Sequence, residues 1–206
     1  MTTLLTLLDI ACGRPIPDED AGRARRMQLV VTARLASLVF AACWGLAIGS
    51  SSTTLAVANV YKVPMVVLLS CAFAAPAGIL AWRLSGAAVR GTDLALGFAG
   101  GMFGGTLVLA VLAPLVALYY HSSAFAGPLL ADGTALVAVV LGAVVFQRLA
   151  LRAPGARKNV VGFVVPGVIL GVQAAAMLQL VALASPILPD PTMFRHGVDG
   201  IVETSR

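Results

Sequence analysis

Four polar residues lie inside apolar stretches or at their borders, and they are the residues of this chain best suited to chemistry within a membrane. They are Asp132, Lys62, Asn59 and His121. Ionisable side chains in a bilayer are costly and usually face the protein interior or water. A buried pair of Asp132 with Lys62 would lower the cost of inserting both charges. We therefore expect this polar site near the outer side of the membrane, as a structural ion pair or as a proton- or ion-responsive mouth of a substrate path.

The depth of Asp132 has two interpretations. If the apolar stretch 125–146 crosses the membrane as one helix, Asp132 lies roughly 10 Å below its outer end. Alternatively, the span begins later, and Asp132 with Gly133 forms a turn or an N-cap outside the bilayer. The remaining stretch 134–146 is too short to cross alone, which favours the embedded position.

The composition excludes a water-soluble domain. Of 206 residues, 59% are hydrophobic and only 11% are charged, whereas soluble domains carry about 25% charged residues. The net charge of +5 does not indicate a nucleic-acid partner, because the basic residues are distributed between apolar stretches. The three cysteines form no Cys-x-x-Cys pair, so we expect neither a disulfide framework nor a zinc site. We expect no cofactor.

Five apolar stretches have the length of a membrane span, which is roughly 20 residues for a hydrocarbon core of about 30 Å. They are 29–50, 60–80, 94–119, 125–146 and 160–184. The predicted fold is all-α, an integral membrane bundle of five transmembrane helices. The chain then divides into an N-terminal segment (1–28), a transmembrane domain (29–184) and a tail (185–206). Short loops predict that consecutive spans are antiparallel neighbours.

Lys and Arg alternate between the two sides of these spans. They are abundant before the first span, after the second and after the fourth, and scarce in the other connections. Because cytoplasmic loops carry the excess of positive charge, we expect a cytoplasmic N-terminus and a C-terminal tail outside. The expected location is the cell membrane, the inner membrane in a bacterium. Arg34, early in the first span, can extend back to the N-terminal side.

Two segments are expected to contact lipid headgroups. The N-terminal run MTTLLTLLDIAC lacks the basic region of a signal peptide, so we expect an interfacial helix with Leu4, Leu5, Leu7 and Leu8 in the headgroup region. The cluster of Arg148, Arg152, Arg157 and Lys158 either binds anionic headgroups or only sets the topology.

Glycines recur at helical spacing in two of the spans. Gly97, Gly101 and Gly105 form one row in 94–119, with Gly100 and Gly104 beside it, and the last span carries Gly167 and Gly171. In lipid, small residues let helix backbones approach closely. These rows predict packing within the bundle, with a dimer interface or a pore lining as the alternative. Gln173 and Gln179 are expected to form hydrogen bonds between helices.

The sequence contains none of the common catalytic signatures. It has no GxxxxGK[ST] phosphate loop, no HExxH metal helix and no GxSxG elbow. We therefore expect that the chain is not an enzyme.

A pattern of Asn, Lys, Pro and Gly residues runs through the second and third spans. The second span opens with Asn-x-x-Lys-x-Pro, followed by a mid-span Pro, a Leu-x-Gly at its end and an Ala-Pro late in the third span. These are Asn59, Lys62, Pro64, Pro76, Leu84-Ser85-Gly86 and Ala113-Pro114, within 29–151. The pattern resembles bacterial members of the Yip (Ypt-interacting protein) family. The resemblance implies a five-span, non-enzymatic membrane protein and supplies no catalytic residues.

The resulting hypothesis is a scaffold, adaptor or accessory subunit that lies in the bilayer and binds a membrane-protein partner or a second copy of itself. The alternative is a small permease or channel component that uses Asp132 and Lys62 on its outer side, with the glycine face of 94–119.

Overall fold

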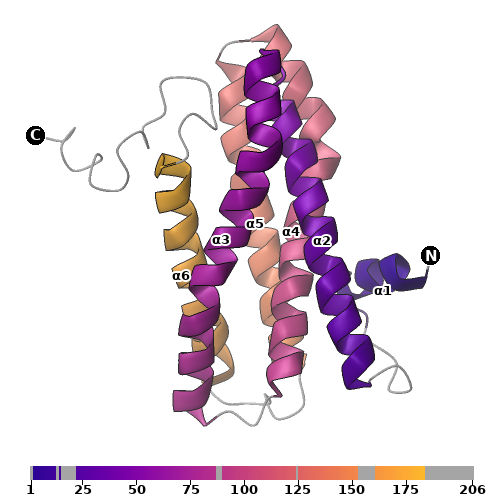
Figure 1. The fold of residues 1–206 in the computed structure, drawn as a ribbon, viewed down its shortest axis with the longest axis vertical. Coiled ribbons are helices and arrows are strands. Elements are labelled where there is room, and N and C mark those ends of the chain that lie inside the picture. Colours follow the sequence, from indigo (N-terminus) through magenta and orange to yellow (C-terminus); the bar gives the residue numbers. More distant parts are fainter. Residues whose placement is uncertain are drawn as a thin grey trace, which may run out of the picture.

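The computed structural model describes residues 2–12, 14, 22–86, 90–123, 125–152 and 161–183. This part of the chain forms helices and no strands, which confirms the all-α prediction (Figure 1). The helices are α1 (Thr2–Ala11), α2 (Arg23–Ile48), α3 (Thr53–Ser85), α4 (Gly91–Ser122), α5 (Ala126–Arg152) and α6 (Val161–Leu183). The helices α2 to α6 are long and apolar enough to cross a membrane, which indicates a multi-pass membrane protein.

The helices α3 and α4 extend at both ends beyond the apolar stretches that predicted them, α2 begins earlier and α5 ends later than predicted, and α6 stays within the predicted stretch. The second stretch, 60–80, belongs to a helix of 33 residues, α3. The extra turns carry polar and basic residues such as Thr53 and Arg83, which a hydropathy criterion leaves out. Gly86 ends α3 with φ of +61°, a left-handed conformation that suits glycine at a helix C-cap.

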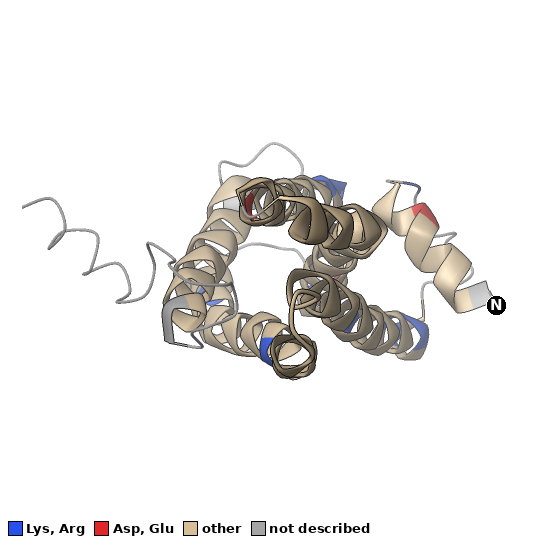
Figure 2. Cartoon of the chain, turned by 90° about the horizontal axis from the view of Figure 1, so that it is seen from above, with Lys and Arg blue, Asp and Glu red and all other residues tan. Residues whose placement is uncertain are grey.

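The five long helices form a ring in the order α2, α3, α6, α5, α4. In this ring α2 packs on α3 and on α4, α3 packs on α6, and α4 packs on α5, while α5 and α6 make a much smaller contact that closes the ring. Figure 2 shows the bundle from above, with few charged residues along its ribbons. The prediction that consecutive helices are neighbours is therefore confirmed for α2–α3 and α4–α5 but is wrong for α3–α4, because α3 packs on α2 and α6 instead.

One end of the bundle gathers most of the basic residues of the described chain. There α2, α4 and α6 begin and α3 and α5 end (Figure 1). We call this end, which carries Arg23, Arg25, Arg26, Arg83, Arg90, Arg148 and Arg152, the basic end, and the other the opposite end.

Glycines bring α4 and α5 into backbone contact. A Cβ atom placed on Gly101 or on Gly105 would lie 2.7 Å from a carbonyl oxygen of α5, that of Gly142 or that of Ala138. Gly97, in the same row as Gly101 and Gly105, lies against Phe146 of α5. In the second row, Gly100 lies against Leu149 of α5 and Ile10 of α1, and Gly104 lies against Val145. A larger side chain in this interface would force the two backbones apart.

A second glycine contact, which the predictions from the sequence do not include, joins α2 and α3. Gly45 of α2 and Gly49, the C-cap of that helix, are four residues apart, and a Cβ on either would clash with the α3 backbone at Asn59 or Ala56. The Gly-x-x-x-Gly spacing of Gly45 and Gly49 is the sequence signal that indicates this close helix contact.

Gly167 and Gly171 do not follow the expected packing. Both are exposed on α6, and an added Cβ meets no atom within 4 Å. The reason is that α6 turns a different face to α3, where Ile169 packs against Gly78. Internal packing at these two glycines is therefore not what the structure shows.

The short helix α1 lies crosswise beside the long helices (Figure 1). Leu7 and Ile10 are buried in a cluster with Leu29 of α2 and Phe103 of α4. Other leucines of α1, namely Leu4, Leu5 and Leu8, are exposed. Of the four leucines expected in the headgroup region, Leu7 thus packs on protein instead.

The α4–α5 contact predicts a position-specific effect of enlarging a glycine. We expect Gly101→Val to lower the free energy of unfolding by about 1–3 kcal/mol, because the added side chain overpacks a backbone contact. The measurement is thermal or denaturant unfolding in detergent. Gly171→Val is the matched control, since it adds the same atoms in open space and should leave stability unchanged. Equal losses in both variants would contradict the assignment.

Candidate functional site

The four residues of the predicted polar site lie in different surroundings. Asn59 is fully buried (0% exposed) in α3, where its backbone faces Gly45 of α2. Lys62 is half-buried one turn further along α3. His121 is exposed in the last turn of α4, and Asp132 is exposed on α5.

The proposed pair of Asp132 with Lys62 does not form. Within the described residues, the salt bridges are Arg14–Asp9 and Arg26–Asp93. Both residues of the expected pair do lie beside the same apolar cluster, because Val63 and Ala131 are members of it. They remain apart because α3 and α5 are not neighbours in the ring.

Asp132 lies inside a helix. Since α5 begins at Ala126, the alternative in which Asp132 and Gly133 form a turn or an N-cap is wrong. Gly133 borders open space, so this side of α5 faces outward. On α4, Tyr120 lies within electrostatic range of Asp132, and its hydroxyl is buried without a hydrogen-bond partner among the described residues.

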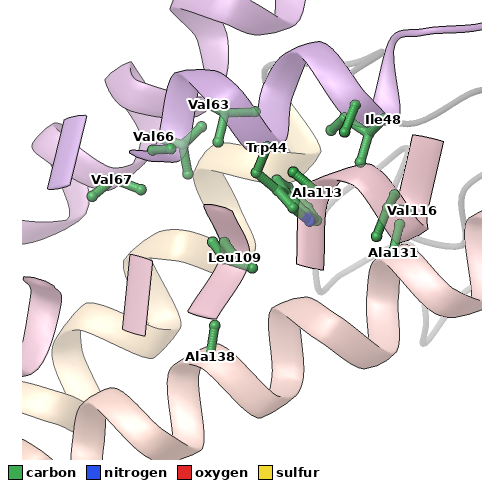
Figure 3. Packing of buried hydrophobic residues seen from close by; sticks show 12 residues of the cluster. Trp44, Ile48, Val63, Val66, Val67, Leu109, Ala113, Val116, Ala131 and Ala138 are labelled. Carbon is green, nitrogen blue, oxygen red and sulfur yellow. The ribbon is translucent and has the colours of Figure 1, made fainter. Parts of the chain in front are cut away.

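The interior of the opposite half is filled around one indole ring. Trp44 of α2 is buried among Val63, Val66, Leu109 and Ala113 (Figure 3). Its Nε1 donates to Thr134 Oγ1 of α5 at 3.3 Å, so the side chain reaches across the ring. At this level a large apolar group occupies the centre of the bundle.

The interior nearer the basic end contains a charged and polar group of side chains. The Arg34 guanidinium lies over the Phe98 ring of α4, 5.6 Å from its centroid. On α3, Cys71 Sγ lies 3.1 Å from Met102 Sδ of α4 and accepts a hydrogen bond from Gln173 Nε2 of α6 at 3.4 Å. Gln173 thus links two helices, whereas Gln179 is exposed.

A mostly buried ion pair joins α2 to α4 at the basic end. Arg26 and Asp93 are bonded, and their side chains are only 16% and 11% exposed. The second carboxylate oxygen of Asp93 is buried with no hydrogen-bond partner in the described chain. The sequence gives no signal for this pair, because a separation of 67 residues does not indicate that the two helices will pack side by side.

The basic cluster is only partly described. Arg148 and Arg152 are exposed near the end of α5, and Arg157 and Lys158 lie outside the described residues. The two described arginines are placed at the basic end, with the start of α2 and the end of α3.

The helices α5 and α6 are the least buried of the five long helices. Only 22% and 17% of their most apolar windows are buried, against 39% to 50% for the other three spans. On α5 the outward face carries Leu129, Asp132, Gly133, Leu136 and Val140, and on α6 it carries Gly167, Gly171, Ala175 and Gln179. We call these residues the α5–α6 surface.

In the described ranges, no group of three or more His, Cys, Asp or Glu residues is arranged to hold a metal ion. Comparisons with protein-family models, with curated proteins and with solved structures found no match for the chain. The resemblance to the Yip family therefore stays a prediction from the sequence.

The Arg26–Asp93 pair predicts a large stability effect from a small chemical change. We expect Asp93→Asn to lower the free energy of unfolding by about 3 kcal/mol, because it leaves a mostly buried guanidinium uncompensated. Denaturant titration in detergent measures this loss.

Asp9→Asn is the matched control, because the Arg14–Asp9 pair is 75% and 51% exposed and should contribute at most about 1 kcal/mol. An Asp93→Asn variant as stable as the Asp9→Asn variant would refute the structural role of the pair.

Proposed function

We propose that this chain is a non-enzymatic accessory subunit or scaffold of the cell membrane, with its basic end in the cytoplasm, and that it binds a transmembrane helix of a partner protein through the α5–α6 surface. The observation that supports this most directly is the Asp132 side chain. It is an exposed carboxylate on a membrane-spanning helix and has no salt bridge within the described residues.

The depth of Asp132 makes the exposure costly. The 27 residues of α5 span about 40 Å, so a hydrocarbon core of about 30 Å leaves about 5 Å of helix at each side. Asp132 lies six residues after Ala126, about 9 Å along the axis and thus inside the core. A carboxylate at this depth is usually paired or faces protein, and a Lys, an Arg or another donor on a partner helix would offset its cost.

The neighbouring helix α6 offers a suitable packing surface. Gly167, Gly171 and Ala175 repeat every four residues and are exposed, which permits close approach of another backbone. Gln179 continues the same row toward the opposite end. Its amide can form the interhelical hydrogen bonds that support helix association in lipid.

The chemistry of the partner follows from these groups. It is a transmembrane helix with a small-residue face and a basic or amide side chain near the opposite end of the bundle. The gathering of Arg residues at the basic end supports the orientation, because positive charge is retained in the cytoplasm.

Site-specific photo-crosslinking in native membranes tests the proposal. A photoreactive residue replaces Gly133 or Ala175 on the α5–α6 surface, and Leu35 or Val39 on the exposed side of α2 as controls. We expect one protein adduct of discrete mass from the first two positions only. Asp132→Asn should reduce this adduct several-fold, whereas Asp9→Asn, which neutralises an exposed carboxylate elsewhere, should not.

Two results would contradict the proposal. One is an adduct that forms equally from α2 positions or is unchanged by Asp132→Asn. The other is solute flux in proteoliposomes that disappears in Asp132→Asn, which would favour the permease alternative. An adduct of doubled mass would identify the partner as a second copy of the chain.

A further inference from the structure

Arg34 is a charged side chain well inside the length of α2, where an apolar residue could fill the same space. It lies eleven residues after the first residue of α2, about 17 Å along the helix axis. Its guanidinium stacks on buried Phe98 of α4 and lies within electrostatic range of buried Cys71 of α3. A side chain of α2 that approaches both of its ring neighbours points between them, toward the inside of the ring.

No carboxylate in the described chain neutralises this charge. The described acids are Asp9, Asp93 and Asp132. The first two are bonded to Arg14 and Arg26, and the third lies in the opposite half. The ring of Phe98 stabilises a guanidinium only in part, so among the described residues the positive charge of Arg34 has no carboxylate counterion.

The position of Arg34 is open to the membrane. The helices α2 and α3 touch at Gly45 and Gly49, and their axes diverge from there toward the basic end (Figure 1). Arg34 is partly exposed, and the exposed residues beside it on α2, Val31 and Leu35, are apolar. Because helical side chains lean toward the N-terminus of their helix, the guanidinium is directed toward the headgroups at the basic end.

We propose that Arg34 binds the phosphate of an anionic phospholipid that enters between α2 and α3 from the leaflet at the basic end. A guanidinium offers paired donors that match phosphate oxygens. Arg23 and Arg25, earlier in the same helix, attract anionic headgroups to this end. The apolar flanks at Val31 and Leu35 suit acyl chains, which a free phosphate ion lacks.

Native mass spectrometry of the full chain tests the proposal. The protein is released from vesicles of phosphatidylcholine and phosphatidylglycerol, and retained lipid is counted. We expect one retained phosphatidylglycerol in the unaltered protein and at least about fivefold less in Arg34→Gln, because this change removes one lipid-facing cation together with its paired donors. Arg148→Gln, which removes an exposed arginine at the same end, should retain the lipid.

Further measurements distinguish lipid binding at Arg34 from binding of a free anion and from a folding defect of the variant. Millimolar inorganic phosphate should not displace the lipid, and displacement would overturn the lipid assignment in favour of a free-anion site. If Arg34→Gln does not elute as a monodisperse species, Arg34→Lys decides, because it keeps the charge but loses the paired donors. Retention by Arg34→Lys equal to that of Arg148→Lys, or retention of phosphatidylcholine as strongly as phosphatidylglycerol, would overturn the proposal.

Discussion

The structure depends on close contact between helix backbones. Lipid chains are as apolar as leucine, so the helices gain little from burying apolar side chains against one another. The helices are stabilised instead by van der Waals packing between their backbones, which glycines allow to approach closely. Gly101 and Gly105 admit the carbonyl groups of α5, and Gly45 and Gly49 admit the α3 backbone. These two interfaces pair α4 with α5 and α2 with α3, and the contact of α2 with α4 joins the two pairs.

One consequence is a bundle whose two halves differ. Near the opposite end, α2 and α3 are held together and Trp44 extends across the space between α2 and α5. Toward the basic end the same two helices separate (Figure 1), and the interior holds Arg34, Cys71 and Gln173. The Arg26–Asp93 pair lies at this end and ties α2 to α4 while α2 diverges from α3.

The sequence predicted the helical class and the five long apolar helices, because hydropathy over a span-length window depends on composition and not on neighbours. It did not predict contacts that depend on which helices pack together. Charge and depth pair Asp132 with Lys62, but the ring separates α3 from α5. Nothing in the sequence pairs Arg26 with Asp93, because two parallel helices that are not consecutive bring them together.

The glycine rows also show that the sequence does not predict which helix faces pack together. Spacing alone does not distinguish a row that faces a neighbour from one that faces lipid. Gly97, Gly101 and Gly105 lie against α5, whereas Gly167 and Gly171, with the same spacing, lie in the open. The distinction depends on the rotation of α6, which is fixed by Ile169 against Gly78 of α3 and therefore by a residue about 90 positions earlier.

The place of α6 in the ring bears on how the chain assembles during synthesis. From α3 onward, each long helix finds a principal neighbour already made, so the helices can associate in the order in which they leave the ribosome. The last helix docks on α3, made three helices earlier, and its contact with α5, made just before it, is slight. Ring closure is therefore a late, long-range step, and until it occurs the α3 surface around Cys71 and Gly78 must be shielded by lipid or by the insertion machinery.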